Sequence, residues 1–303
     1  MKRKCSTPEG KFDVVLDTDA YNEIDDQFAL SYMLCSQDKL RVKAIYAAPF
    51  FNKNAFSPED GMKKSYEEIL NLLQLAGETE MTANVYKGSI NYMKDEKTPV
   101  LSVAAENLSR TAMEYSAENP LYIVAIGAIT NIASALLLNP QIAQRIVIVW
   151  LGGHSFEYHD TDEFNMRQDI AAARVVFNCN APLVLLPCNG VVSSFSTSRH
   201  ELEHWLKGKN KLCDYLVSHT VREAESYASG TAWTRVIWDV TAVAWLLNEN
   251  DRFMLSRMEE RRMPGYDSKY ENTGNGKFLR YVYYIKRDAL FTDMFQKLAG
   301  KRE

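Results

Sequence analysis

The chain has 303 residues, of which 46% are hydrophobic and 24% charged, so it is long and apolar enough to bury a large core. Its formal net charge is -4 and its basic residues are dispersed, which argues against a nucleic-acid partner or an anionic membrane surface. The five cysteines form no CxxC pair, there is no membrane-spanning apolar run, and no signal peptide precedes Asp13. We therefore expect a reduced, cytoplasmic protein without disulfides or zinc.

Short β-branched apolar runs alternate with longer helical patterns up to Pro187. The expected strands are 13–18, 42–47, 121–126, 146–151 and 183–186, and the expected helices are 24–34, 61–75, 100–115, 131–138 and 171–178. Several strands lack polar alternation, as is usual when both faces of a parallel sheet are covered. This rhythm predicts an α/β fold with an open, mostly parallel sheet and helices on both faces.

The C-terminal part has mainly helical patterns. We expect helices at 199–206, 211–227, 239–247 and 289–298, a polar stretch at 266–277 and a strand at 278–285. The basic pair Arg261-Arg262 is interpreted as solvated surface. Because no Pro/Gly/Ser-rich linker divides the chain, we expect one domain spanning residues 1–303.

Four aspartates follow the first expected strand, and they are the strongest functional signal in the sequence. The strand runs into Asp17 and Asp19, and Asp25 and Asp26 then open a helix. Ligand sites of α/β proteins lie where strands end and helices begin, and so many carboxylates together favour a hard cation. The alternative is that Asp25 and Asp26 only cap a helix and complement its dipole.

This segment resembles the N-terminal signature of the inosine–uridine-preferring nucleoside hydrolase family, an apolar strand, Asp-x-Asp, a short loop and Asp-Asp. Three further matches follow in the family's order: the segments 127–131 (GAITN), 151–165 (LGG…EFN) and 238–240 (WDV). The loop between Asp19 and Asp25 is two residues longer than the family's commonest form. The resemblance implies a nucleoside hydrolase-like fold and calcium-dependent cleavage of the N-glycosidic bond of ribonucleosides, in nucleoside salvage and purine metabolism.

By this resemblance, Ca²⁺ would be held by Asp19, Asp26, Asp239 and the main-chain carbonyl of Thr130. Asp19 would also be the catalytic residue, because it is placed to take a proton from the attacking water. Asp239 and Thr130 could each alternatively be no more than a helix cap.

The resemblance also implies a set of substrate-binding residues. Asp25 and Asn165 would bind the ribose 2′- and 3′-hydroxyls, and Glu163 would reach the 5′-hydroxyl. Leu151 would pack near the ribose, and Asn52 (or Asn54, since the register is open) would reach the ribose from the loop after the second strand. In the loop between the LGG and EFN segments, His154 and His159 are interpreted as surface residues.

Trp238 stands where many pyrimidine-accepting relatives have a histidine that protonates the leaving base. An indole cannot act as that acid, but it offers a flat face to a nucleobase. We therefore expect a slight preference for purine nucleosides, against the alternative that Trp238 is a core residue.

Two other functions compete with nucleoside hydrolysis. The Asp-Thr-Asp segment also resembles the first motif of haloacid-dehalogenase-type phosphatases, but Tyr21 departs from that pattern and a matching later Asp motif is not found. A non-catalytic or altered-specificity nucleoside- or sugar-binding member of the same fold is the stronger rival. Whether the chain is catalytic or only binds its ligand, the assemblies of related nucleoside hydrolases suggest a homodimer or homotetramer.

Overall fold

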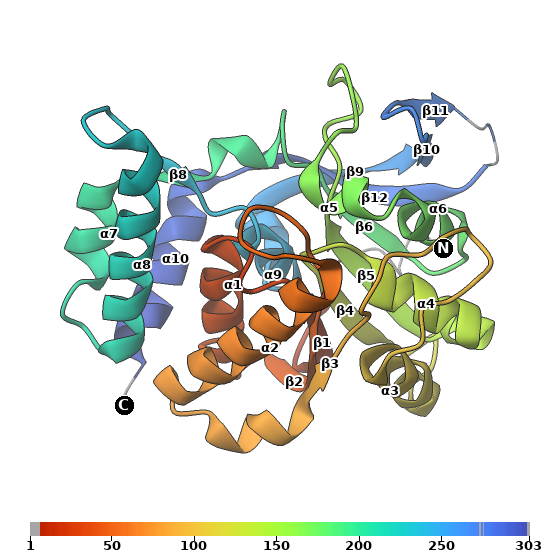
Figure 1. Cartoon of the computed structure of the whole chain (residues 1–303), viewed down its shortest axis with the longest axis horizontal. Coiled ribbons are helices and arrows are strands. Elements are labelled where there is room, and N and C mark those ends of the chain that lie inside the picture. The colour runs from red at the N-terminus through yellow and green to blue at the C-terminus, as the bar shows by residue number, and fades with distance from the viewer. Residues whose placement is uncertain (1–6, 273, 275, 302–303) are drawn as a thin grey trace.

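The computed structural model describes residues 7–272, 274 and 276–301, and an eight-stranded sheet lies at its centre (Figure 1). Its strand order is β3-β2-β1-β4-β5-β6-β12-β9. The strands are β1 (Phe12–Thr18), β2 (Leu40–Ala47), β3 (Val85–Lys87), β4 (Leu121–Ala125), β5 (Ile146–Leu151), β6 (Leu183–Leu186), β9 (Met254–Glu260) and β12 (Phe278–Ile285). Every neighbouring pair is parallel except β12 and β9. The predicted open, mostly parallel sheet is confirmed.

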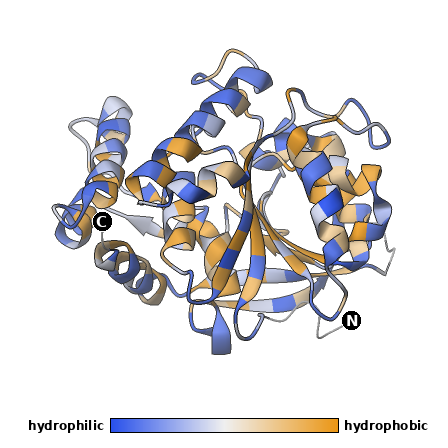
Figure 2. Ribbon diagram, turned by 90° about the horizontal axis from the view of Figure 1, so that it is seen from below, coloured by the Kyte–Doolittle hydropathy of each residue, from blue (hydrophilic) through white to orange (hydrophobic). Residues whose placement is uncertain are grey.

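Helices cover both faces of this sheet. Residues alternate between the two faces along β1, so Val14 and Leu16 join one apolar core while Val15 joins the other. The first core includes residues of α1 (Asp25–Leu34), α2 (Pro58–Leu75), α7 (Arg199–Leu206), α8 (Lys211–Ala228), α9 (Val240–Leu246) and α10 (Arg287–Gly300). The second includes residues of α3 (Val103–Thr111), α4 (Thr130–Leu138) and α6 (Ile170–Asn178). In Figure 2 the strands are largely orange and the outward helix faces largely blue, as this layered burial requires.

The helical C-terminal part is present, and α7, α8 and α10 stand together at one end of the molecule (Figure 1). Side-chain caps fix where several helices begin. Ser57 caps α2 by accepting the amide hydrogen of Asp60, and Pro58 occupies the first helical position. Asn210 caps α8 in the same way through the amide of Cys213. The Ser57 cap starts α2 three residues earlier than the apolar periodicity of the sequence predicted.

Several short elements were not predicted. They are β7 (Ser196–Thr197), β8 (Arg235–Val236), β10 (Arg262–Pro264), β11 (Tyr270–Asn272) and α5 (Phe164–Gln168), together with β3 and β9 of the main sheet. β9 is an edge strand rich in charge, which hides the apolar alternation that marks strands. β10 and β11 pair as an antiparallel ribbon, and β11 lies within the stretch expected to be polar loop.

The interpretation of Arg261 as solvated surface is wrong. Its side chain is buried and donates hydrogen bonds to the carbonyls of Phe177, in the last turn of α6, and of Cys179 and Ala181, just after that helix. A buried guanidinium needs such partners, and the carboxyl end of a helix supplies them. Within the described residues, no helix has the length and apolarity needed to cross a membrane.

Candidate active site

A pocket of about 340 Å³ lies at the carboxyl ends of the central parallel strands. This is the edge at which α/β sheets place their ligand sites. Most of its lining comes from the loops after β1, β5 and β6, the short helix α5 and the segment before α9. The lining residues are Asn22, Glu23, Asp25, Asp26, Ile126, Leu151, His154, Asp162, Glu163, Phe164, Asn165, Arg167, Cys188, Asn189, Trp238 and Asp239.

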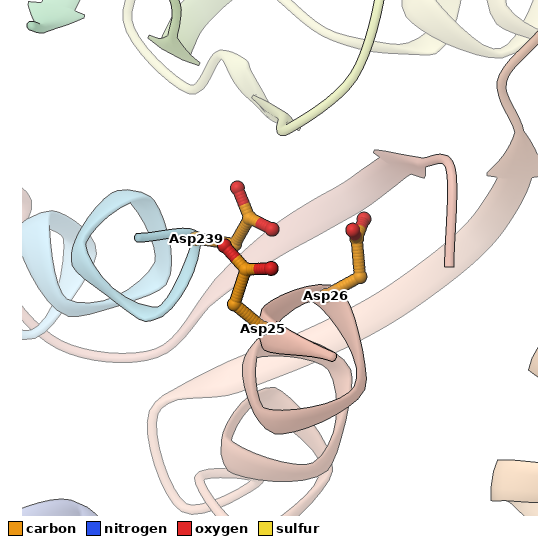
Figure 3. A group of neighbouring side chains, drawn as sticks. All are labelled: Asp25, Asp26 and Asp239. Atoms are coloured by element: carbon orange, nitrogen blue, oxygen red, sulfur yellow. The ribbon is translucent and has the colours of Figure 1, made fainter. Parts of the chain in front are cut away.

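Three buried carboxylates meet at one wall of this pocket (Figure 3). Asp25 and Asp26 are the first residues of α1, and Asp239 immediately precedes α9. One oxygen of each lies within 4.8 Å of the others. Thr18, the last residue of β1, donates a hydrogen bond of 2.5 Å to Oδ1 of Asp26 and so fixes that side chain.

Asp19 lies beside this cluster and just beyond the end of β1. Both of its carboxylate oxygens are buried, and neither has a hydrogen-bond partner among the described residues. A Cβ atom on Gly127 would stand 2.9 Å from Oδ1 of Asp19, so the site requires a glycine there. Asp17 turns toward the other face of the sheet, where its Oδ1 accepts a hydrogen bond of 2.8 Å from Asn131. Asp17 and Asp19 therefore have different surroundings.

The buried charge of these groups is poorly compensated by protein atoms alone. Burial, reinforced by the neighbouring carboxylates, raises the pKa of Asp19, Asp26 and Asp239 well above the ordinary range. Burial likewise raises the pKa of Asp25 to about 7, although the guanidinium of Arg235 opposes this shift. Buried carboxylates that converge at one point, beside the two unpartnered oxygens of Asp19, suit a divalent cation with oxygen ligands.

Thr130 is the first residue of α4 and is fully buried. Its hydroxyl donates a hydrogen bond of 2.7 Å to Asp169, which orients the helix start next to β4. The cluster of three carboxylates is made of Asp25, Asp26 and Asp239, and Asp19 as a metal ligand stays a prediction. The carbonyl of Thr130 as a metal ligand stays a prediction.

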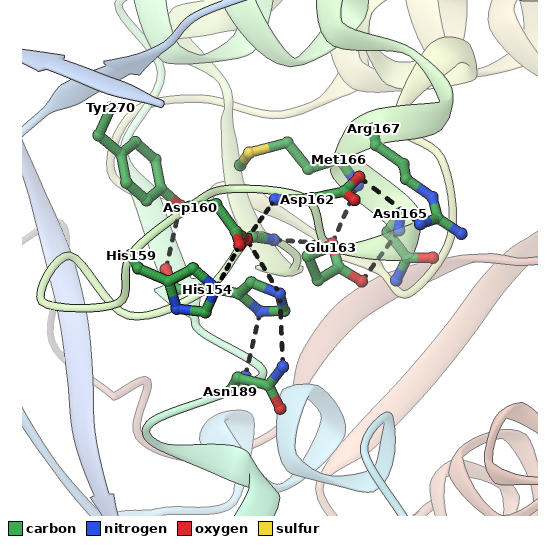
Figure 4. Close-up of polar contacts among 11 residues, drawn as sticks. His154, His159, Asp160, Asp162, Glu163, Asn165, Met166, Arg167, Asn189 and Tyr270 are labelled. Carbon is green, nitrogen blue, oxygen red and sulfur yellow. Dashed lines mark hydrogen bonds and ion pairs between the residues drawn. The ribbon is translucent and has the colours of Figure 1, made fainter. Parts of the chain in front are cut away.

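The opposite wall is built around Glu163 (Figure 4). Its carboxylate accepts hydrogen bonds from the backbone amides of Gly153 (2.8 Å), Asn165 (2.9 Å) and Met166 (2.9 Å). Glu163 thus caps α5 and ties the loop after β5 to it. The thiol of Cys188 also bonds to this carboxylate. Most of the acceptor capacity of Glu163 is therefore used within the protein.

Asn165 is held with its amide group turned inward. Its Nδ2 donates to the carbonyls of Ile126 (3.2 Å) and Leu151 (3.1 Å), at the ends of β4 and β5. Since both amide hydrogens are used in this way, Oδ1 of Asn165 is the atom available to accept a hydrogen bond from a ligand in the pocket.

Residues 14–271 match the sequence model of the family described as inosine-uridine preferring nucleoside hydrolase. The chain belongs to this family. Two curated proteins align with part of this chain, and each alignment covers less than half of the curated protein. One is a probable ribonucleoside hydrolase of Dictyostelium discoideum, 29% identical over 92 residues, which are 29% of this chain and 27% of that protein. The other is a probable uridine nucleosidase 2 of Arabidopsis thaliana, 26% identical over 133 residues, or 43% and 40% of the two chains.

The fold of this nucleoside hydrolase family member is also similar to the folds of solved structures. A purine-preferring ribonucleoside hydrolase from Gardnerella vaginalis superimposes with a TM-score of 0.75 at 17% identity, over 95% of this chain and 98% of that chain. The nucleoside hydrolase-like architecture inferred from four sequence motifs is therefore confirmed. The family depends on a metal, and the buried acidic cluster at this pocket fits that dependence.

Among the residues proposed to bind substrate, Asp25, Leu151, Glu163, Asn165 and Trp238 line the pocket. Asn52 does not belong to the lining. Its Nδ2 donates a hydrogen bond of 2.6 Å to Oδ1 of Asn22, and Asn22 itself lines the pocket from the longer loop after β1.

Sequence reasoning missed part of this lining. His154, interpreted as a surface residue, is buried, and its Nδ1 accepts the amide hydrogen of Asn189 at 3.3 Å. Burial lowers the pKa of His154. Cys188 and Asn189 follow β6, the strand next to β5, so position at the carboxyl end of a central strand was the signal that could have found them. Glu23 was missed because it lies in the loop that departs from the family pattern.

Proposed function

We propose that this chain is a calcium-dependent hydrolase that splits the N-glycosidic bond of ribonucleosides into ribose and free base. The observation that carries this proposal is the meeting of Asp25, Asp26 and Asp239 beside the unpartnered carboxylate of Asp19. A pocket that combines a cation site with oriented amide and carboxylate acceptors is suited to a polyhydroxylated sugar.

Asp19, Asp26, Asp239 and the Thr130 carbonyl would hold the ion. Ca²⁺ is favoured over Mg²⁺ because it accepts more oxygen ligands in irregular arrangements. When bound, it would acidify a coordinated water and hold it for attack on the anomeric carbon. Asp19 would accept the proton of that water, since its oxygens have no other partner among the residues that the structure describes.

Asp25 and Asn165 would bind the ribose hydroxyls from opposite walls of the pocket. Cleavage of the bond gives the sugar oxocarbenium character, and acceptors fixed in place stabilise that charge without having to reorganise. Oδ1 of Asn165 is fixed by the two carbonyls that hold Nδ2. Glu163 would approach the 5′-hydroxyl only with the acceptor capacity that three backbone amides leave free.

Trp238 supports the slight preference for purine nucleosides. It lines the pocket next to Asp239 and is only partly buried, so its ring can stack on a base. The relatives' names point both ways, to uridine in the Arabidopsis protein and to purines in the Gardnerella enzyme. The preference therefore rests on this chain's own indole.

The test is release of reducing sugar from a panel of purine and pyrimidine nucleosides, with and without a calcium chelator. Release that stops with the chelator and returns with added Ca²⁺ is expected. Saturable nucleoside binding without release would instead identify the alternative, a non-catalytic or altered-specificity member of the fold. We also propose that the protein is a cytoplasmic homodimer or homotetramer that acts in nucleoside salvage. Light scattering of the purified protein tests its oligomeric state.

A further inference from the structure

The longer loop after β1 brings an acidic residue into the pocket that no part of the proposed mechanism uses. Glu23 lies two residues before Asp25 and lines the pocket. Its Oε2 accepts a hydrogen bond of 2.7 Å from Nη2 of Arg235. Its Oε1 has no hydrogen-bond partner among the described residues, so it can still accept one from a ligand.

Arg235, which lies in the segment that carries Trp238, holds the side chain of Glu23. Arg235 belongs to β8, three residues before Trp238 in the chain. Its Nε also donates to Oε2 of Glu223 at 3.1 Å, and its side chain is only 13% exposed. The guanidinium is therefore fixed from two sides, and it fixes the carboxylate of Glu23 in turn.

The loop that carries Glu23 is also tied down at other points. Asn22 accepts hydrogen bonds from Asn52 and Asn54, which follow β2. The backbone amide of Tyr21 lies 3.5 Å from the hydroxyl of Ser65 in α2. A carboxylate on so firmly held a loop keeps one position, which recognition of a small ligand requires.

We propose that Glu23, fixed by Arg235, is a specificity-determining residue that recognises N–H donors on the edge of the nucleobase and favours guanine. This inference rests on the proposed function. Glu23 lines the same pocket and its side chain is 43% exposed, so with the sugar over Asp25 and the base against Trp238 it would face the outer edge of the base.

The choice of guanine follows from the donors that each base presents. Guanine offers two parallel donors, N1–H and the 2-amino group: one can bond to the free Oε1 of Glu23 and the other to the acceptor site that Arg235 leaves on Oε2. Hypoxanthine offers N1–H alone, and adenine presents N1 as an acceptor, which a carboxylate repels. Hydrogen bonds to a charged partner are stronger than neutral ones, so the difference between these bases is measurable in kcat/KM.

The test compares kcat/KM for guanosine, inosine and adenosine in the intact protein with Ca²⁺, for the wild type, Glu23→Gln and the control Glu225→Gln. The variant Glu23→Gln keeps the shape of the side chain but removes one of the two acceptors. Its ratio of guanosine to inosine activity is expected to fall about tenfold, with adenosine gaining relative to both. The exposed Glu225→Gln lies on α8, where Glu225 pairs with Arg199 away from Arg235, and it is expected to keep the wild-type ratio.

Ratios are used because Glu23 also influences the ionisation of Asp25, which would change all substrates alike. Glu23→Asp, which withdraws the carboxylate from the rim, is expected to lower the same ratio. An unchanged ratio in both Glu23 variants would overturn the inference while leaving nucleoside hydrolysis intact. Absence of ribose release by the wild type from every nucleoside would instead overturn the proposed function itself.

Discussion

One carboxylate oxygen of Asp26 lies within 4.8 Å of one of Asp239, although the two residues lie far apart in the sequence. The contact of α1 with α9 brings them together, and both helices begin at the carboxyl edge of the sheet. Asp25 shares this cluster, and the charges of Asp25 and Asp26 contribute to the raised pKa of Asp19. The fold thus gathers several carboxylates at one site, and the chemistry of the site depends on how their negative charge is compensated.

Replacement of Asp19 by Asn is expected to lower kcat by about 10³-fold or more, because the variant lacks the group that accepts the proton. The fold should survive, since the substitution removes a buried charge and keeps the side-chain shape. Initial rates of ribose release together with circular dichroism measure the two effects. The exposed Asp38→Asn is the matched control and should keep the wild-type rate. A near-normal rate in Asp19→Asn would remove Asp19 from the mechanism.

Calcium is expected to stabilise the protein more at pH 8 than at pH 5.5. Without the ion, burial raises the pKa of Asp25 to about 7, and burial and the neighbouring carboxylates raise the pKa of Asp19, Asp26 and Asp239 well above the ordinary range. A raised folded-state pKa contributes stability at low pH, and this contribution is lost as the pH rises through that value. Bound Ca²⁺ favours the ionised carboxylates and so removes this loss of stability at high pH.

The measurement is the melting temperature of metal-free protein, prepared by chelation and dialysis, with and without added Ca²⁺ across this pH range. A stabilisation by Ca²⁺ that is constant with pH, or that shrinks as the pH rises, would contradict the account.

Trp238→Ala is expected to reduce kcat/KM for purine nucleosides about tenfold more than for uridine, because a purine presents the larger stacking surface. Calcium affinity, measured by calorimetry, should stay the same, since the indole is not a ligand. Trp238→Phe keeps an aromatic face and should recover part of the purine activity. Equal losses for all nucleosides would show that Trp238 supports the fold of the segment and does not bind the base.

Glu163→Ala is expected to lower the free energy of unfolding by about 1–3 kcal/mol, because it leaves backbone amides of the β5 loop and α5 without their acceptor. Urea denaturation measures this change. Glu157 lies in the same loop and is exposed, so Glu157→Ala should stay within about 0.5 kcal/mol of wild type. If the Glu163 variant is as stable as wild type and only loses substrate affinity, the carboxylate serves the ligand and not the loop.

Much of the sheet could be predicted from sequence because its buried strands are continuous apolar runs. Residues 146–151, 183–186 and 278–285 are strands with the predicted bounds. β9 was missed because an edge strand carries charges that interrupt this pattern. Short pairings such as β10 with β11 depend on contacts between distant segments, which local pattern does not reveal.

The candidate site was found because strand ends and family motifs mark it, but its hydrogen bonds could not be predicted. The sequence shows that Glu163 and Asn165 are close in the chain; it does not show that Glu163 caps α5 or that Asn165 turns its amide group inward. The burial of His154 and the position of Glu23 follow from loop conformations. These conformations are set by tertiary contacts such as the pair of Glu23 and Arg235.

The most direct test of the central claim is a crystal structure grown with Ca²⁺. The account predicts one ion bound by the carboxylates of Asp19, Asp26 and Asp239, with oxygen distances of about 2.3–2.6 Å. Distances of about 2.0–2.1 Å would indicate Mg²⁺. An active enzyme whose carboxylates bind no ion, and whose ribose release is unaffected by chelation, would contradict the account.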